Sequence, residues 1–309
     1  MRIVSTLPTA TEIIYQLGLG SSLVGVSHEC NYPKEASKKP RVSKVDFDYG
    51  TAASSEIDDY VGEKMHNHHS LYQLKDELVT ALAPTHLITQ KLCDVCAVTP
   101  NDVQRVIKSL TEKPELITLN PTNLEEILKD ILMVGSSLGR GKEAIELVEK
   151  LRSKIEQIKL KTHKLQRKTI FCVEWIDPPY ASGHWIPEMV DIAGGSEVLG
   201  WKGKPSRKVS WEDVLKADPE ILVFMPCGFS LEKTILEIRN CLSKDSAFRS
   251  LRAIRNIQVW VVDGPSYFNQ SGPRVLAKGV EILAKIIHPE VFESPTKAEA
   301  TKLSSTYFL

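Results

Sequence analysis

The chain has 309 residues, of which 42% are hydrophobic, enough for one large or two medium domains with real cores. Its 39 Lys and Arg balance 39 Asp and Glu, so no basic excess indicates a nucleic-acid partner. No apolar run approaches the ~20 residues that a membrane-spanning helix needs. Six cysteines over this length exclude a disulfide-rich scaffold.

The N-terminal residues MRIVSTLP read as a short strand followed by a proline, without the long apolar segment of a secretory signal. As it stands, the sequence therefore predicts a cytoplasmic protein. The alternative is a mature extracytoplasmic form whose leader was removed.

The first part of the chain alternates short apolar runs with helical patterns. After a polar stretch at Lys34–Ser70 the alternation continues. Strands are expected at Arg2–Ser5, Leu23–Val26, Leu87–Thr89 and Glu115–Leu119, and helices at Thr11–Leu17, Leu71–Ala83 and Asp102–Leu110. Such alternation is typical of a parallel sheet covered by helices.

A long charged helix is expected in the middle of the chain, at about Lys142–Leu165, where apolar residues recur at helical spacing. The strand–helix alternation then resumes. Strands are expected at Thr169–Val173, Ile221–Phe224 and Val259–Val262, and helices at Pro187–Ala193, Trp211–Ala217, Leu231–Leu242 and Pro273–Ile287.

The two halves repeat one scheme, because DELVTALAPTHLIT and EDVLKADPEILVF each read as a helix, a proline and an apolar strand. The predicted fold is therefore α/β, with two parallel-sheet lobes joined by a single long helix and a ligand cleft between the lobes. The expected spans are 1–135 for the N-terminal lobe, 136–167 for the linking helix, 168–292 for the C-terminal lobe and 293–309 for a polar, loosely held tail.

Polar, aromatic and thiol side chains concentrate just after the predicted strands, where an open α/β sheet binds its ligand. The candidate ligand-binding residues are Pro8, Thr9, His28, Glu29, Cys30, Tyr32, Glu174, Trp175, His184, Trp185, Phe229, Tyr267 and Phe268. The four aromatics Trp175, Trp185, Tyr267 and Phe268 are expected to stack on a flat or broad ligand.

Several stretches resemble the cobalamin-binding substrate-binding proteins of ABC importers: STLPTATEIIYQLGLGSSLVGVSHECNYP, PPYASGHWIPEMVDIAGGSEVLG and SWEDVLKADPEILVF. The similarity extends over roughly residues 2 to 290. It implies two α/β lobes on one stiff helix and non-catalytic binding of a corrinoid or related metal chelate between them. Proteins of this shape also bind haem, siderophores and bare metals.

The resemblance also implies a permease partner, to which a Glu on each lobe docks. Asp102 and Glu232 are plausible counterparts, each near the start of a helix. A monomer is expected. The absence of an export signal and the number of cleft cysteines depart from the family's pattern.

Cysteines and histidines after the strands allow a second interpretation. Cys93, Cys96, Cys227, His28, Cys30 and His184 could hold a transition metal such as Zn, Cu or Fe. A cytoplasmic metal-binding protein or metalloenzyme is therefore the alternative function, with Glu29 or Glu174 as an oxygen donor or base. The same cysteines could instead be small wall residues of the pocket.

The other cysteine and histidine motifs give weaker evidence for a redox or metal site. The C-x-x-C pair Cys93/Cys96 is too far from the following helix for a redox dithiol. The tract His66–His69 is interpreted as a solvated loop, and Cys172 and Cys241 as inert thiols among core-type residues.

Overall fold

The computed structural model describes residues 1–66, 71–91, 98, 100–242 and 246–307, in which the chain forms two units. Unit 1 contains residues Met1–Asp48, Asp59–Pro121 and Glu125–Lys150. Unit 2 contains Tyr49–Asp58, Thr122–Leu124 and Leu151–Leu309. A short segment from the first part of the sequence, Tyr49–Asp58, thus belongs to the second unit.

Unit 1 is built on a parallel sheet with the strand order β2-β1-β5-β6. Its strands are β1 (Ile3–Ser5), β2 (Leu23–Val26), β5 (His86–Gln90) and β6 (Glu115–Leu119). The helices that accompany it are α1 (Pro8–Gln16), α3 (Asp76–Leu82), α4 (Pro100–Ser109) and α5 (Leu124–Ser137). The central strand β1 is buried at every residue, as expected for a parallel strand covered on both faces.

The polar stretch Lys34–Ser70 contains more structure than its composition suggests. It includes a 3-10 turn (Lys34–Lys38), strand β3 (Ser43–Val45) and helix α2 (Ser54–His66). Strand β3 pairs antiparallel with β4 (Tyr72–Leu74), so the helix expected at Leu71–Ala83 is in fact a strand followed by α3. Residues 67–69 of the histidine tract lie outside the described residues, whereas His66 ends α2.

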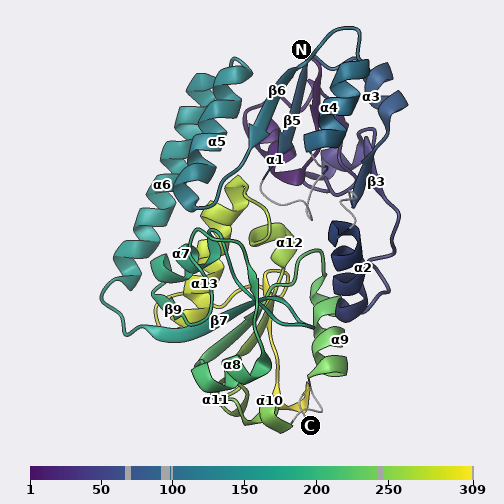
Figure 1. Ribbon diagram of the computed structural model, residues 1–309. Coiled ribbons are helices and arrows are strands. Elements are labelled where there is room, and N and C mark those ends of the chain that lie inside the picture. Colours follow the sequence, from purple (N-terminus) through teal and green to yellow (C-terminus); the bar gives the residue numbers. More distant parts are fainter. Residues whose placement is uncertain (67–70, 92–97, 99, 243–245, 308–309) are drawn as a thin grey trace. The chain divides into compact units, whose positions relative to one another are not determined.

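Helix α6 (Gly141–Thr162) belongs to unit 1 up to Lys150 and to unit 2 from Leu151, so one helix joins the two units. It is visible as the long teal helix in Figure 1. This confirms the long charged helix predicted from the sequence. The fold is accordingly α/β, with parallel-sheet units on either side of that helix in the chain.

Unit 2 carries a mixed sheet with the strand order β10-β8-β7-β11-β12-β13, and β9 also pairs with β7. Its strands are β7 (Lys168–Trp175), β8 (Tyr180–Ala181), β9 (Gly195–Glu197), β10 (Arg207–Lys208), β11 (Ile221–Phe224), β12 (Val259–Val262) and β13 (Ala300–Lys302). The parallel core of this sheet is β7, β11 and β12.

Helices cover the sheet of unit 2. They are α7 (Ile186–Ile192), α8 (Trp211–Ala217), α9 (Leu231–Cys241), α10 (Ser246–Ser250), α11 (Arg252–Arg255), α12 (Gly264–Tyr267) and α13 (Val280–Ile287), with a π-helical turn at Val275–Gly279. Helix α7 packs against α13, and α9 lies beside β12 (Figure 1). The core beneath them is large and apolar, with Phe171, Phe224 and Phe248 fully or almost fully buried.

The polar tail is not loosely held. Strand β13 pairs antiparallel with β12, and the following Leu303 is fully buried in the core of unit 2. A three-residue edge strand leaves little periodicity in the sequence, which is why a tail was expected instead.

The internal repeat predicted from the sequence is confirmed in detail. Helices α3 and α8 each end at a left-handed residue, Ala83 with φ of 39° and Asp218 with φ of 36°. A proline follows each of them, and the chain then enters the apolar strands β5 and β11.

Among the described helices, none has the length and apolar character needed to cross a membrane.

Candidate ligand-binding site

The loop after β2 in unit 1 is held by one guanidinium group. Arg41 Nη1 donates to the carbonyl oxygens of Ser27 and Cys30, each at 2.8 Å, and Nη2 donates to Asn31 Oδ1 at 3.0 Å. The Ser27 carbonyl oxygen also accepts from Cys30 N at 3.2 Å, so backbone and side-chain bonds together fold the loop after β2. Arg41 therefore fixes the backbone of the loop that carries His28, Glu29 and Cys30.

His28 and Glu29 belong to a closed polar network. His28 Nδ1 lies 2.8 Å from Ser43 Oγ, and its ring lies 4.9 Å from the ring of Tyr72. The Tyr72 hydroxyl donates to Glu29 Oε1 at 3.2 Å. Burial, with help from the charges of Arg41 and Lys75, lowers the pKa of His28 to about 4, so its imidazole is neutral at physiological pH.

Cys30 is fully buried, and the Thr11 hydroxyl lies 3.1 Å from its Sγ atom. Burial raises the pKa of this thiol to about 11. A metal ligand must be a thiolate, which this environment disfavours. The geometry of Cys30 favours the interpretation as a small wall residue.

The remaining unit 1 candidates differ in exposure. Pro8 occupies the first turn of α1 and is half-buried, whereas Thr9 beside it is buried. Tyr32 is 41% exposed. Cys93 and Cys96 lie outside the described residues, so their part in a site stays a prediction.

In unit 2, Glu174 near the end of β7 ties three loops together. Its carboxylate accepts hydrogen bonds from Gly183 N at 3.2 Å and from the Ser206 hydroxyl, and its carbonyl oxygen accepts from Cys227 N at 3.3 Å. A Cβ atom at position 183 would lie 2.4 Å from Ser206 N, so only glycine allows this approach. Glu174 therefore organises the loops rather than facing solvent as a free base.

Trp175, the last residue of β7, is half-buried and held on two sides. Its Nε1 donates to the Ser54 carbonyl oxygen at 3.1 Å, and its ring lies 5.0 Å from that of Phe229. The Lys233 ammonium lies 4.1 Å from the centre of the Phe229 ring. The result is a fixed aromatic surface at the carboxyl end of β7.

Three aromatic residues that the sequence predicts as ligand contacts are instead buried in the interior of unit 2. Trp185 is 4% exposed and its Nε1 donates to the Phe268 carbonyl oxygen at 2.8 Å. Phe268 and Phe229 are buried as well. Because the indole N–H of Trp185 is bonded to the Phe268 backbone and the ring is buried, Trp185 stabilises the loop after β12 and has little surface left on which a ligand could stack.

His184 and Tyr267 keep partial exposure. His184 adopts a left-handed conformation with φ of 49°, its ring lies 5.6 Å from that of Trp185, and burial lowers the pKa of its imidazole. The Arg274 guanidinium lies 5.9 Å from the centre of the Tyr267 ring. Cys227 is exposed. The structure therefore leaves part of the surface of His184, Tyr267 and Cys227 exposed, and their contact with a ligand stays a prediction.

No group of three or more His, Cys, Asp or Glu side chains that could hold a metal ion occurs in the part of the chain that the structure describes. Cys172 is fully buried, as expected for an inert thiol, whereas Cys241 is half-buried and contacts Glu237. The described residues thus give the metalloenzyme alternative no support.

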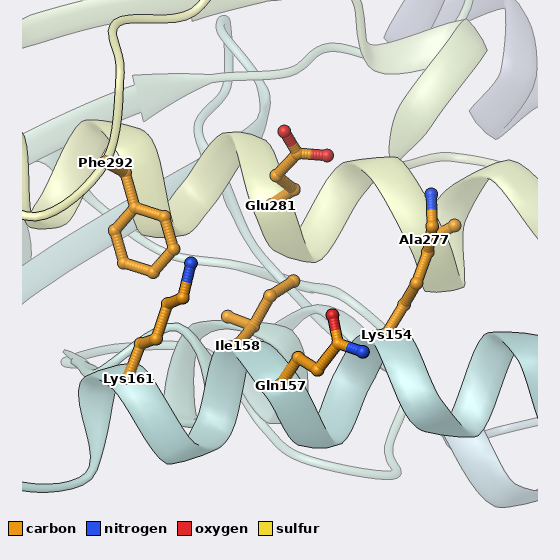
Figure 2. Close-up of a pocket in the computed structure, with 7 residues that line it drawn as sticks. All are labelled: Lys154, Gln157, Ile158, Lys161, Ala277, Glu281 and Phe292. Carbon is orange, nitrogen blue, oxygen red and sulfur yellow. The ribbon is translucent and has the colours of Figure 1, made fainter.

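A separate pocket lies elsewhere in unit 2, between α6 and the last long helix. Figure 2 shows four α6 side chains on one side of this pocket and Ala277, Glu281 and Phe292 on the other. The pocket has a volume of about 190 Å³ and is lined by Lys154, Gln157, Ile158, Lys161, Ala277, Glu281 and Phe292. None of the candidate ligand residues lines it. Its charged rim and position beside the joining helix separate it from the strand-end loops.

Three residues connected to Trp175, directly or through Ser54 and Phe229, were not among the candidates, namely Ser54, Lys233 and Glu237. Ser54 lies in the stretch that reads as polar loop, and the other two lie within a helix pattern. Their contacts join positions up to 184 residues apart in the chain, for which a single sequence carries no local signal.

Two α/β units that share one long helix, with polar and aromatic loops after their strands, are the architecture of two-lobed solute-binding proteins. The model of the periplasmic binding protein family matches residues 3–265, and the chain belongs to this family. Members of the family are binding proteins of ABC transporters rather than enzymes, which confirms the non-catalytic prediction.

The relatives agree with this assignment. An uncharacterized ABC transporter substrate-binding lipoprotein of Bacillus subtilis is 26% identical over 305 residues, covering 94% of this chain and 81% of that protein. The vitamin B12-binding protein of Vibrio parahaemolyticus is 24% identical over 289 residues, covering 91% and 87%. A periplasmic haem-binding protein of Pseudomonas aeruginosa has a similar fold, with a TM-score of 0.73, 18% identity and coverage of 98% and 99%.

Proposed function

We propose that this protein binds a corrinoid or a closely related metal chelate and delivers it to an ABC permease. The observation that carries the proposal is the fixed aromatic surface of Trp175 at the end of β7, stabilised by Phe229 and Ser54. A macrocycle with broad apolar faces gains most from such a surface, because burying an aromatic contact contributes about 1–3 kcal/mol.

The relatives narrow the ligand class. One binds vitamin B12, and a protein of the same fold binds haem. Both ligands are broad metal macrocycles with polar groups at their periphery. His184 and Tyr267 at the strand ends of unit 2, and His28 at those of unit 1, could meet such edges. That the ligand lies between the two lobes stays a prediction.

The place of action is proposed to be extracytoplasmic. The Bacillus subtilis relative is a lipoprotein and the haem-binding protein is periplasmic. These relatives do not support the cytoplasmic location that the sequence predicts.

For the permease contact, Glu232 is the better of the two acidic candidates. It is exposed in the first turn of α9, and hydrogen bonds from its own backbone and from Ser230 lower the pKa of its carboxyl group, so it carries a full negative charge. Asp102 instead forms an ion pair with Arg105 at 3.3 Å.

The test is a titration of the purified chain with cyanocobalamin, haemin and a ferric hydroxamate, followed by visible difference spectra and by quenching of tryptophan fluorescence. Saturable one-to-one binding of cyanocobalamin in the micromolar range or tighter is expected. Binding of haemin alone would mean that the ligand is haem rather than a corrinoid. No binding of any of the three would contradict the proposal.

A further inference from the structure

The segment Tyr49–Asp58 is attached to unit 2 at both ends. The Lys233 ammonium donates to the Tyr49 carbonyl oxygen. At the other end, the Tyr180 hydroxyl donates to Asp58 Oδ1 at 3.0 Å and Lys208 Nζ donates to Asp58 Oδ2 at 2.8 Å. The segment is thus docked on β8, β10 and α9, although it precedes them by more than a hundred residues.

Its centre is fixed by a buried carboxylate. Ser54 is fully buried, and both its backbone N–H and its hydroxyl donate to Glu237 Oε1 at 2.6 Å. Glu237 lies on α9 and is only 6% exposed. A buried carboxylate is costly unless donors are aimed at it, and bonds to a charged acceptor are the strong ones.

The same bonds cap a helix. Ser54 is the first residue of α2, where the backbone N–H groups have no partner within the helix. Glu237 supplies an acceptor for one of them from a different helix, which stabilises the docked segment.

The carbonyl oxygen of the same Ser54 accepts the indole N–H of Trp175 at 3.1 Å. Glu237, Ser54 and Trp175 therefore form one chain of hydrogen bonds that runs from α9 to the end of β7. It holds the edge of the Trp175 ring, while the ring itself stays half-buried and keeps a part of its surface free.

We infer that Ser54 and Glu237 are positioning residues for Trp175, and that the docked segment Tyr49–Asp58 preorganises the ligand-contacting ring. The inference rests on the proposed function and specifies how its site achieves affinity. A side chain that is already fixed loses less freedom when the ligand binds, so affinity rises without a new contact. The ligand class that needs such a platform is a rigid, broad metal chelate.

The experiment compares Glu237→Ala, Glu237→Gln and Trp175→Phe with the matched control Asn240→Ala, an exposed position on the same helix. Hydrogen exchange of the amides in 49–58 is measured first, without any ligand. Loss of the charge-assisted bonds in Glu237→Ala should accelerate exchange by about 10–100-fold. Glu237→Gln keeps an acceptor oxygen and should rescue most of the protection.

Tryptophan emission gives the second reading. Its change in Glu237→Ala should vanish in a Trp175→Phe background, because the other four indoles lie elsewhere in the chain. Thermal unfolding checks that each variant is folded. If Glu237→Ala does not fold, Ser54→Ala and Glu237→Gln carry the comparison.

Affinity for cyanocobalamin is the third reading. Glu237→Ala and Trp175→Phe should each weaken binding by about 5–10-fold. Because both substitutions interrupt the same chain of hydrogen bonds, the loss of affinity in the double variant should be smaller than the product of the two single losses. Unchanged exchange in 49–58, additive losses, or tighter binding after release of the segment would each overturn the inference. If the parent chain binds no chelate while exchange responds as expected, the proposed function fails and the docking of the segment stands.

Discussion

The loops after β2 in unit 1 and after β7 in unit 2 follow parallel strands in the same way, yet their side chains are used differently. His28, Glu29 and Cys30 are engaged in hydrogen bonds within unit 1, with the thiol fully buried. Trp175, the last residue of β7 in unit 2, is held by a hydrogen bond at its indole N–H and by the Phe229 ring, and it stays only half-buried. Strand-end position alone therefore does not make a ligand contact, because what matters is which surface the supporting bonds leave free.

The same contrast occurs within unit 2 between two tryptophans. Trp185 and Trp175 both donate their indole N–H to a backbone carbonyl oxygen. Trp185 is enclosed on all sides, whereas Trp175 is not. One ring stabilises the fold, and the other is the ring that we propose to contact the ligand.

The largest expected effect is a loss of stability that distinguishes Trp185 from Trp175. Trp185→Ala should lower the free energy of unfolding by about 3–5 kcal/mol, because it leaves a large cavity and an unpaired Phe268 carbonyl oxygen. Urea unfolding followed by circular dichroism measures it. Trp201→Ala, at a position 53% exposed, is the control and should cost much less. A loss below about 1 kcal/mol for Trp185→Ala would show that this ring is not a core residue.

The second prediction concerns ligand affinity. Trp175→Ala should weaken cyanocobalamin binding by about 10–100-fold, the effect of removing a central aromatic contact. Its stability should change less than that of Trp185→Ala, since part of the Trp175 ring is already solvated. Isothermal titration calorimetry on both variants, each at a temperature where it is folded, separates the two effects. Equal affinities for Trp175→Ala and the parent would remove this ring from the site.

Much of the fold could be predicted from the sequence, because the apolar runs are strong. Helix Trp211–Ala217 begins and ends where expected, since Ser210 and Asp213 form a capping box that the sequence displays. Strands Glu115–Leu119 and Val259–Val262 match as well. Helix α2 was missed because only Ser54 and Ile57 are buried in it, which leaves no apolar periodicity.

The site could be predicted only to the level of its loops. The sequence marks Trp175 and Trp185 as equivalent aromatics after strands. It contains nothing that brings the Phe268 carbonyl oxygen to one of them and the Ser54 carbonyl oxygen to the other. Burial of a side chain depends on contacts between distant segments, and these set the chemistry of Cys30 and His28 too.

The third prediction is a pH dependence that belongs to unit 1. His28 has a pKa of about 4 in the folded chain against 6.5 for an ordinary histidine. Above about pH 6.5 neither state binds the proton. As the pH falls toward 4, only the unfolded state binds it, so the folded state loses about 1–2 kcal/mol, allowing for partial solvation.

Burial raises the pKa of the neighbouring Glu29, which acts in the opposite direction. The contribution of His28 is therefore read as the difference between the parent and His28→Asn, each unfolded in urea at pH 7 and pH 5. The gap between the two proteins should shift in favour of the variant by about 1–2 kcal/mol at the lower pH. A gap that does not change with pH would mean that His28 is freely solvated.

The smallest expected effect separates the thiols of the two units. Cys227 is exposed in unit 2, so Cys227→Ser should change the free energy of unfolding by less than about 0.5 kcal/mol. Cys30 is buried in unit 1 with its pKa raised to about 11, so it has neither the access nor the thiolate that alkylation requires. Iodoacetamide at pH 8, with peptide mapping by mass spectrometry, should modify Cys227 in the native protein and Cys30 only after denaturant is added. Native labelling of Cys30 as fast as that of Cys227 would mean that the loop after β2 opens readily, and that unit 1 offers its thiol to a ligand after all.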